Sequence, residues 1–181
     1  MHLAFIDKII SLIGRTFDGI CDDIIMLGNK LNSIISAKNH IDKAREKREI
    51  LKRQTKYDHR ILCLEWIDPY FSAGHWVPEQ IELAGFNSAI GQTGDQSRIL
   101  SADEIVDSDP YAIALICCGY NLEQNLTFSS QLFHDDRLNH LDPFKENRVY
   151  SFDADSYFSR PTTRILEGSI QLRSQILGNQ I

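Results

Sequence analysis

Residues Glu65 to Glu79 read E-W-I-D-P-Y-F-S-A-G-H-W-V-P-E, and this stretch decides the fold. It directly follows the apolar run Ile61–Leu64, which has the length and bounds of a buried strand. It leads into Gln80–Gly85, a pattern typical of a helix that ends on a glycine. A strand, an aromatic turn and a helix in this order form one α/β unit. Because open α/β sheets bind ligands at the carboxyl ends of their strands, this turn is the first candidate for a site.

Both tryptophans of the chain, Trp66 and Trp76, lie in this turn. Large aromatic side chains commonly anchor protein cores, so either ring could be buried. Aromatic side chains in a loop at a strand end also commonly face a ligand or a partner. We expect the second arrangement for both rings.

The same order of elements recurs along the rest of the chain. We expect further strands near Ser88–Ile90, Ala112–Cys117 and Arg148–Phe152, separated by helices. Alternation of this kind predicts an α/β fold with a parallel, Rossmann-like sheet and right-handed crossovers.

The segment before this lobe is predicted to be helical. Apolar spacing indicates one helix from Phe17 that ends at Gly28, and a second, increasingly charged helix over Leu31–Tyr57. At 1.5 Å per residue the second helix would be about 40 Å long, which suits a strut. The short apolar run Ile9–Leu12, ended by Gly14, predicts a strand and turn.

Three turns are therefore expected to share one edge of the sheet, at residues 66–76, 118–120 and 153–160. They carry mainly aromatic side chains and few ionisable groups, an arrangement that suits a large, flat, partly apolar ligand. The candidate ligand-binding residues are Trp66, Asp68, Tyr70, His75, Trp76, Tyr120, Tyr157 and Arg160, and Phe158 lies among them in the sequence.

Composition narrows the class of protein. The chain has 181 residues and a formal net charge of −6, and no apolar run is long enough to cross a membrane. The basic residues between Lys38 and Arg60 alternate with acids at helical spacing and lack interleaved aromatics, which favours a solvated helix face over nucleic-acid binding. The four cysteines form no C-x-x-C pair, so we expect free thiols and no zinc site. No secretion signal is recognised, and a cytoplasmic location is expected.

Catalysis and metal binding have weaker support. Asp68 and His75 could form an acid–base pair, but no activated nucleophile accompanies them. The run H-D-D-R-L-N-H, His134 to His140, has polar side chains whose spacing matches no standard zinc or calcium loop. We therefore expect no enzyme activity, no resident metal and no cofactor.

Several stretches resemble one known family. The run Ile61–Gly85, the helix S-A-D-E-I-V-D-S-D-P, the turn C-C-G-Y and the segment R-V-Y-S-F-D-A-D-S-Y-F-S-R-P are similar to the carboxyl-terminal lobe of cobalamin-type substrate-binding proteins of ABC importers. That class, which also includes iron-siderophore binders, joins two α/β lobes by one rigid helix. The resemblance implies a corrinoid or related metal chelate as ligand and an ABC permease as partner. It also implies that Asp103, with its neighbour Glu104, is the acidic position that docks on the permease.

The resemblance also implies a domain division. Residues 1–16 would be a remnant of the amino-terminal lobe, residues 17–58 the connector with the inter-lobe helix, and residues 59–181 the carboxyl-terminal binding lobe. The amino-terminal lobe is otherwise missing from this sequence, so we expect a truncated cleft with weakened binding.

The truncation leaves other functions open. A non-binding remnant or interaction protein is the main alternative, and a chelatase-like enzyme in which His75 holds the metal is a weaker one. The apolar residues near the start of the sequence would have little to pack on, which predicts self-association. These are Leu3, Phe5, Ile6, Ile9 and Ile10.

Overall fold

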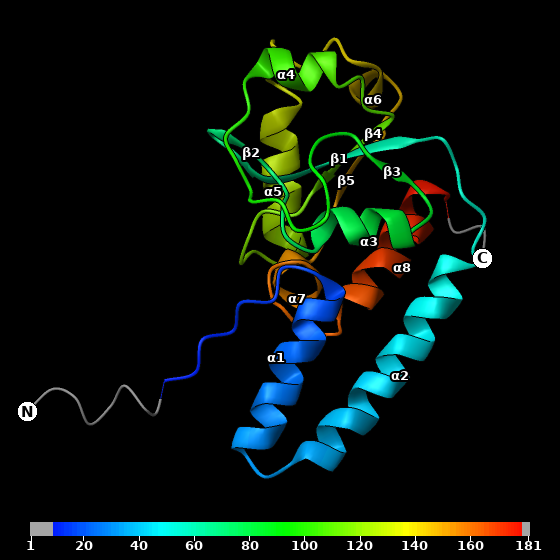
Figure 1. Cartoon of the computed structure of the whole chain (residues 1–181). Helices are drawn as coiled ribbons and strands as arrows, with labels where there is room; N and C mark the ends of the chain where they lie inside the picture. The colour runs from blue at the N-terminus through cyan, green and yellow to red at the C-terminus, as the bar shows by residue number, and fades with distance from the viewer. Residues whose placement is uncertain (1–8, 179–181) are drawn as a thin grey trace, which may run out of the picture.

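The computed structural model describes residues 9–178 and shows an α/β lobe from which a pair of helices projects (Figure 1). The helices are α1 (Phe17–Lys30), α2 (Ile34–Lys52), α3 (Val77–Leu83), α4 (Ala102–Asp107), α5 (Leu122–Leu132), α6 (Asp142–Lys145), α7 (Ala154–Tyr157) and α8 (Ile165–Ile176). The strands are β1 (Arg60–Ile67), β2 (Tyr70–Ser72), β3 (Asn87–Ser88), β4 (Ala112–Leu115) and β5 (Val149–Ser151).

The predicted parallel sheet is confirmed. The strand order is β2-β1-β4-β5, and β3 pairs with the first residues of β1. β1 runs parallel to both β3 and β4, and β4 runs parallel to β5. Strands β1 and β4 are apolar on both faces, as strands covered by helices on both sides must be.

The aromatic turn after β1 differs from the prediction. Instead of ending at Leu64, β1 continues to Ile67 and folds back into β2, which pairs with it antiparallel through Ile67 and Tyr70. A bulge between Leu64 and Trp66 shifts the register. The sequence interpretation missed this hairpin because a three-residue strand carries almost no periodic signal.

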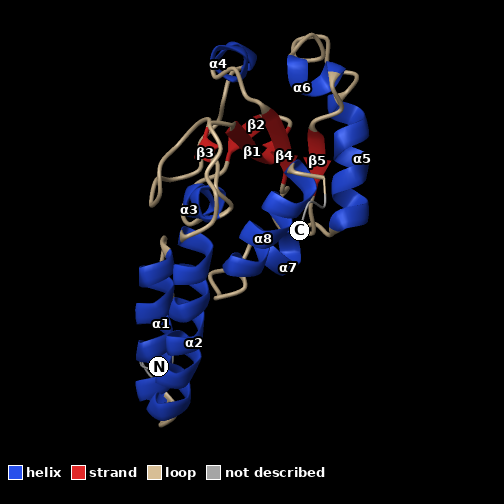
Figure 2. Cartoon of the chain, turned by 90° about the vertical axis from the view of Figure 1, so that its right-hand side faces the viewer, coloured by secondary structure: helices blue, strands red, loops and turns tan. Residues whose placement is uncertain are grey.

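Helices cover both faces of the sheet (Figure 2). Ile61 and Cys63 of β1 pack into a core shared with α1, α2, α3 and α8. The alternate residues Leu62 and Leu64 pack into a second core shared with α4, α5 and α6. The alternation of side chains along one strand therefore assigns each helix to its layer.

The helices α1 and α2 form an antiparallel hairpin that extends away from the sheet (Figures 1 and 2). The predicted long helix is confirmed as unbroken through its centre but is shorter than expected at both ends. It spans 19 residues, or about 28 Å at 1.5 Å per residue, rather than the range Leu31–Tyr57. The chain leaves the helix after Lys52 because it must turn into β1, and the Tyr57 N–H donates to the Gly85 carbonyl at 2.8 Å in that turn.

The predicted strand at Ile9–Leu12 is wrong for the part that the structure describes. Residues 9–13 adopt no regular secondary structure and pair with no strand. Ile9 is 71% exposed and Ile13 is 80% exposed. The expectations for Leu3, Phe5 and Ile6 lie outside the described residues. Self-association stays a prediction.

Gly85 ends α3 in the left-handed region, with φ of 90°, as its position in the sequence predicted. A Cβ atom there would lie 2.7 Å from the Thr55 carbonyl oxygen, so a larger residue would clash with the backbone. The next residue, Phe86, is buried and lies in the ring cluster of Tyr57 and His59. The turn thus places its one left-handed residue at the glycine.

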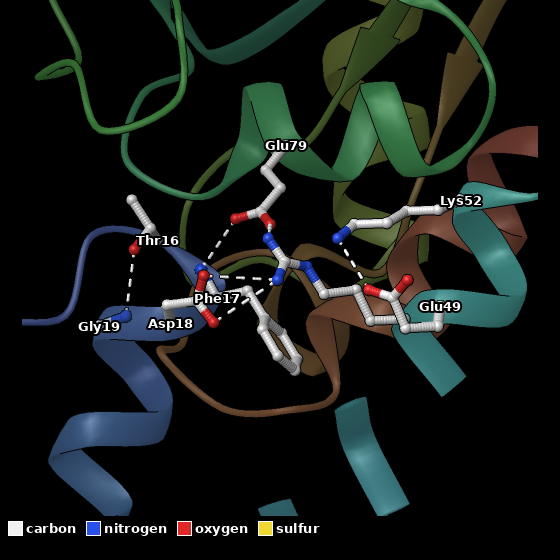
Figure 3. A network of polar contacts seen from close by, with 8 residues as sticks. Thr16, Phe17, Asp18, Gly19, Glu49, Lys52 and Glu79 are labelled. Atoms are coloured by element: carbon white, nitrogen blue, oxygen red, sulfur yellow. Dashed lines mark hydrogen bonds and ion pairs between the residues drawn. The ribbon is translucent and has the colours of Figure 1, made fainter. Parts of the chain in front are cut away.

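An ion pair joins the helical hairpin to the lobe (Figure 3). Arg48 of α2 bonds Glu79 of α3 at 2.5 Å and contacts Asp18 of α1 at 3.4 Å. The second carboxylate oxygen of Glu79 accepts the Phe17 N–H at 2.8 Å, while Thr16 accepts the Gly19 N–H at 3.1 Å. The first turn of α1 is therefore capped partly by a carboxylate from another layer, where the helix dipole favours negative charge.

None of the helices between residues 9 and 178 combines the length and the apolar character needed to cross a bilayer.

Candidate functional site

The loops that follow β1, β4 and β5 meet at the carboxyl edge of the sheet and are bonded to one another. The Cys118 N–H donates to the Glu65 carbonyl at 3.2 Å, and the Asp155 N–H donates to the Tyr120 carbonyl at 3.0 Å. The Gly119 N–H donates to the Ser159 hydroxyl at 3.0 Å. The three turns expected to share an edge therefore do share it.

Asn125, a fully buried residue of α5, ties two of these loops together. Its Oδ1 accepts the Cys117 N–H at 3.0 Å, and its Nδ2 donates to the Phe152 carbonyl at 2.9 Å. One side chain thus bridges the chain just beyond β4 to the residue that follows β5 and satisfies buried backbone groups that no strand pairs.

An aromatic cluster lies on this edge. Trp66 is half-buried, and its ring centroid lies 5.5 Å from that of Tyr120 and 5.9 Å from that of Phe128. The Trp66 Nε1–H donates to the Asp68 carbonyl at 2.9 Å, while the Asp68 side chain is exposed. Sequence reasoning missed Phe128 because it took α5 only as a covering helix, although the helical spacing places Phe128 beside the buried face.

Trp76 is a core residue. It is 8% exposed, packs among the buried residues shared with α3 and α8, and donates its Nε1–H to the Phe158 carbonyl at 2.8 Å. We expected this ring to face a ligand, and the structure corrects that expectation, because the indole anchors the core instead. Only the small exposed part of Trp76 reaches the surface.

Tyr70 is also buried, at 3% exposure, and its hydroxyl bonds the Asp135 carboxylate. Arg137 donates to the same carboxylate through Nε and Nη2 at 2.9 and 2.7 Å and lies over the Tyr70 ring. Burial, followed by the Asp135 bond, raises the pKa of Tyr70, and the Arg137 hydrogen bond holds the pKa of Asp135 well below its usual range. The H-D-D-R-L-N-H loop therefore holds the β1–β2 hairpin through Asp135. Residues 9–178 contain no group of three or more acidic, histidine or cysteine side chains suited to a metal.

Replacing Asp135 by asparagine should make the free energy of unfolding fall less steeply as the pH drops below about 4. Because the folded pKa of Asp135 is depressed, its carboxylate stabilises the fold above about pH 4, and that contribution is lost as pH falls further. Urea unfolding at pH 7, 4 and 2.5 measures the difference. The neighbouring exposed Asp136, replaced by asparagine, is the control. Parallel pH profiles for the wild type and Asp135→Asn would contradict this prediction.

His75 lines a surface pocket of about 320 Å³ beside the loops. Its other lining residues come from the start of the described chain, from the end of the β1–α3 loop and from the loop before α8: Leu12, Ile13, Gly14, Arg15, Trp76 and Pro161. The residue before His75 is tied back to β1, because the Gly74 N–H donates to the Glu65 carboxylate at 3.4 Å. This volume is at the lower end of small-molecule sites, which start at roughly 300 Å³.

Arg15 brings a positive charge to this pocket, and sequence reasoning missed it. Its guanidinium lies against the Gln96 side chain, whose oxygen accepts Nη1 and Nη2 at 3.3 and 3.2 Å once the amide is oriented to do so. The charge was not foreseen because Arg15 lies outside the three turns that the sequence singled out.

Tyr157 and Arg160 lie in the third loop but are engaged with neighbouring side chains. Arg164 lies 5.1 Å from the Tyr157 ring centroid, and the half-buried ring packs against the core. Arg160 is exposed and pairs with Asp155 at 2.6 Å, which raises the pKa of Arg160. A ligand that bound the Arg160 guanidinium would have to share it with Asp155, and one that bound the Arg164 guanidinium would have to share it with the Tyr157 ring.

Asp103 and Glu104 lie on α4, away from these loops, and differ in their bonding. Glu104 forms a capping box with Ser101 and an ion pair with Arg98 at 2.7 Å. The Ser101 N–H, followed by Arg98, lowers the pKa of Glu104. Asp103 is exposed in the same first turn.

The four cysteines are free thiols, as expected. Cys21, Cys63 and Cys117 are buried, and burial raises the pKa of Cys117 to about 12. Cys118 is exposed in the loop after β4.

The arrangement of a parallel sheet, helices on both faces and loops gathered at the carboxyl edge is that of an open α/β fold, in which ligands bind at that edge. The chain belongs to the periplasmic binding protein family, which its residues 10–156 match. The resemblance found in the sequence is thereby confirmed at the level of that family. No curated protein matches the chain in sequence.

Solved structures share the fold. An ABC transporter substrate-binding protein from Listeria monocytogenes EGD-e has a TM-score of 0.79 at 18% identity, over 91% of this chain and 66% of its own. The periplasmic vitamin B12 binding protein BtuF of Vibrio cholerae has a TM-score of 0.67 at 17% identity, over 93% and 64%. IsdE of S. aureus, solved with heme, has a TM-score of 0.73 at 19% identity, over 89% and 65%. This chain therefore spans slightly less than two thirds of the length of these relatives.

Proposed function

We propose that the chain is a ligand-binding lobe of an ABC importer, with cobalamin or a related corrinoid or metal chelate as its ligand, and that it is not an enzyme. The observation that carries the proposal is the aromatic cluster of Trp66, Tyr120 and Phe128 near the carboxyl ends of the strands, together with the pocket that His75 and Arg15 line. Open α/β sheets bind ligands there. The names of the relatives that bind vitamin B12 and heme support the same class of ligand.

The proposed ligand surface is narrower than the candidate set from the sequence. Trp66, Tyr120 and His75 form its centre, with Asp68 and Arg160 at the exposed margin. The proposed ligand surface does not include Trp76, Tyr70 and Tyr157, because each of these side chains is buried or half-buried against the core.

The division into a lobe remnant (1–16), a helical connector (17–58) and a binding lobe (59–181) is part of the proposal. A ligand held by this lobe alone should bind weakly, because less area is buried and no opposite wall is preorganised. The cytoplasmic location stays a prediction. The family is named for periplasmic proteins, so cell fractionation is needed to distinguish the two locations.

We place permease docking at Asp103 rather than at Glu104. The Glu104 carboxylate already bonds Ser101 and Arg98, whereas Asp103 extends from the exposed side of the same turn. Exposed charges of this kind set register and association rate more than affinity.

Replacing Trp66 by alanine should weaken the binding of cyanocobalamin about 5- to 150-fold, which corresponds to about 1–3 kcal/mol for a stacked ring. Titration calorimetry measures the change. The matched control is Tyr111→Ala, because Tyr111 is also half-buried but stacks on His59 at the amino end of β4. Equal affinity in Trp66→Ala and wild type would remove the aromatic cluster from the site. No saturable binding by the wild type would favour the non-binding interaction protein instead.

A further inference from the structure

His75 is held in an unusual backbone conformation. Its φ is 57°, in the left-handed region that non-glycine residues seldom adopt. The His75 N–H donates to the Asp95 carbonyl at 2.6 Å, and its carbonyl accepts the Gly94 N–H at 2.8 Å. Strained positions of this kind persist only where the surroundings fix them, and they concentrate at binding sites.

The imidazole is oriented by the same loop. Its Nδ1 lies 3.4 Å from the Asp95 carbonyl oxygen. A carbonyl can only accept, so the tautomer with its proton on Nδ1 is the one that can donate to it, and that tautomer has its lone pair on Nε2. Metal-binding histidines are commonly oriented in this way, with the second ring nitrogen donating to a carbonyl.

The residues that line the pocket limit which kind of metal species the His75 Nε2 could coordinate. Of the seven residues that line it, His75 is the one with a side chain that coordinates metals. A bare transition-metal ion needs several protein ligands, as zinc sites with three or four show. A metal held here would therefore bring its other donors with it, as a chelate with one open axial position does.

The remaining lining residues fit the periphery of such a chelate. Ile13, Pro161 and the small exposed part of Trp76 offer apolar surface, and Arg15 offers a positive charge for an acidic substituent. A flat macrocycle that carries carboxylates has both of these features.

We infer that His75 supplies an axial ligand, through Nε2, to the metal of a flat anionic chelate, with Arg15 paired to a carboxylate on the rim of that chelate. The inference rests on the proposed function and narrows its ligand class to chelates whose metal has an exchangeable axial position. It separates two classes of ligand: a chelate that His75 coordinates, and one that only stacks on the aromatic cluster.

The experiment uses the full chain with two probes, iron(III) protoporphyrin IX and metal-free protoporphyrin IX. The principal variant is His75→Gly, because glycine suits the positive φ and keeps the loop unstrained. His134→Ala is the matched control, since His134 is exposed and bonds the Ser130 carbonyl at 2.7 Å in another loop. Circular dichroism verifies that each variant is folded.

The expected result is selective. The iron probe should show a shifted Soret band with the wild type and with His134→Ala, and should bind His75→Gly at least tenfold more weakly without the shift. Free imidazole should restore the shifted band in His75→Gly. The metal-free probe should bind all three proteins equally.

Other outcomes overturn the inference in distinguishable ways. An unchanged Soret band in His75→Gly, or an equal loss of both probes, overturns axial coordination and leaves the proposed binding function intact. Failure of the wild type to bind either porphyrin or cyanocobalamin overturns both.

Discussion

Glu79→Ala should lower the free energy of unfolding by about 3 kcal/mol, at the lower end of the range for breaking a buried ion pair. The Glu79 side chain is 7% exposed and that of Arg48 is 19% exposed, so removal of the carboxylate leaves a largely desolvated guanidinium. The Phe17 N–H at the start of α1 loses its acceptor at the same time. The hairpin should therefore loosen from the lobe.

Chemical unfolding followed by circular dichroism measures this effect. Glu82→Ala is the matched control, because Glu82 is exposed on the same helix. A double replacement, Arg48→Met with Glu79→Leu, should recover much of the loss, since apolar pairs of similar volume often replace a buried ion pair without penalty. Equal stability of Glu79→Ala and Glu82→Ala would show that the pair contributes nothing.

The second large effect is expected from Trp76→Ala, with a loss of about 3–5 kcal/mol from the cavity that the indole leaves. Trp76→Phe should lose less, because it keeps most of the apolar volume and gives up chiefly the hydrogen bond to the Phe158 carbonyl, worth about 1 kcal/mol. Trp66→Ala should affect stability less than Trp76→Ala, because Trp66 is only half-buried. Urea unfolding of the three variants measures the order, and a larger loss in Trp66→Ala would contradict it.

The contrast between the two tryptophans shows what the sequence could not decide. Both lie in one turn and both follow a strand, so local pattern treats them alike. Burial of Trp76 depends on Phe158, which is 82 residues away along the chain. A contact of that separation leaves no trace in the local spacing of residues.

The helices and strands of the chain were easier to predict from the sequence than these tertiary contacts. The sequence predicts a helix in the stretch S-A-D-E-I-V-D-S-D-P, and the structure confirms it as α4, which a capping box at Ser101 opens. The β1–β2 hairpin was missed, and the end of α2 was placed too late, because tertiary context sets both. Arg15 escaped notice for the same reason: only the folded chain brings it next to His75.

Asn125 has a thermodynamic consequence for any ligand of this edge. Its two bonds, to the Cys117 N–H and to the Phe152 carbonyl, hold the loops after β4 and β5 in one arrangement before a ligand arrives. Ordering a flexible loop on binding costs conformational entropy that subtracts from affinity. Here most of that ordering is completed when the chain folds. Binding at these loops should therefore proceed with a small entropic penalty from the protein, and heat capacity changes should report burial of ligand surface rather than loop folding.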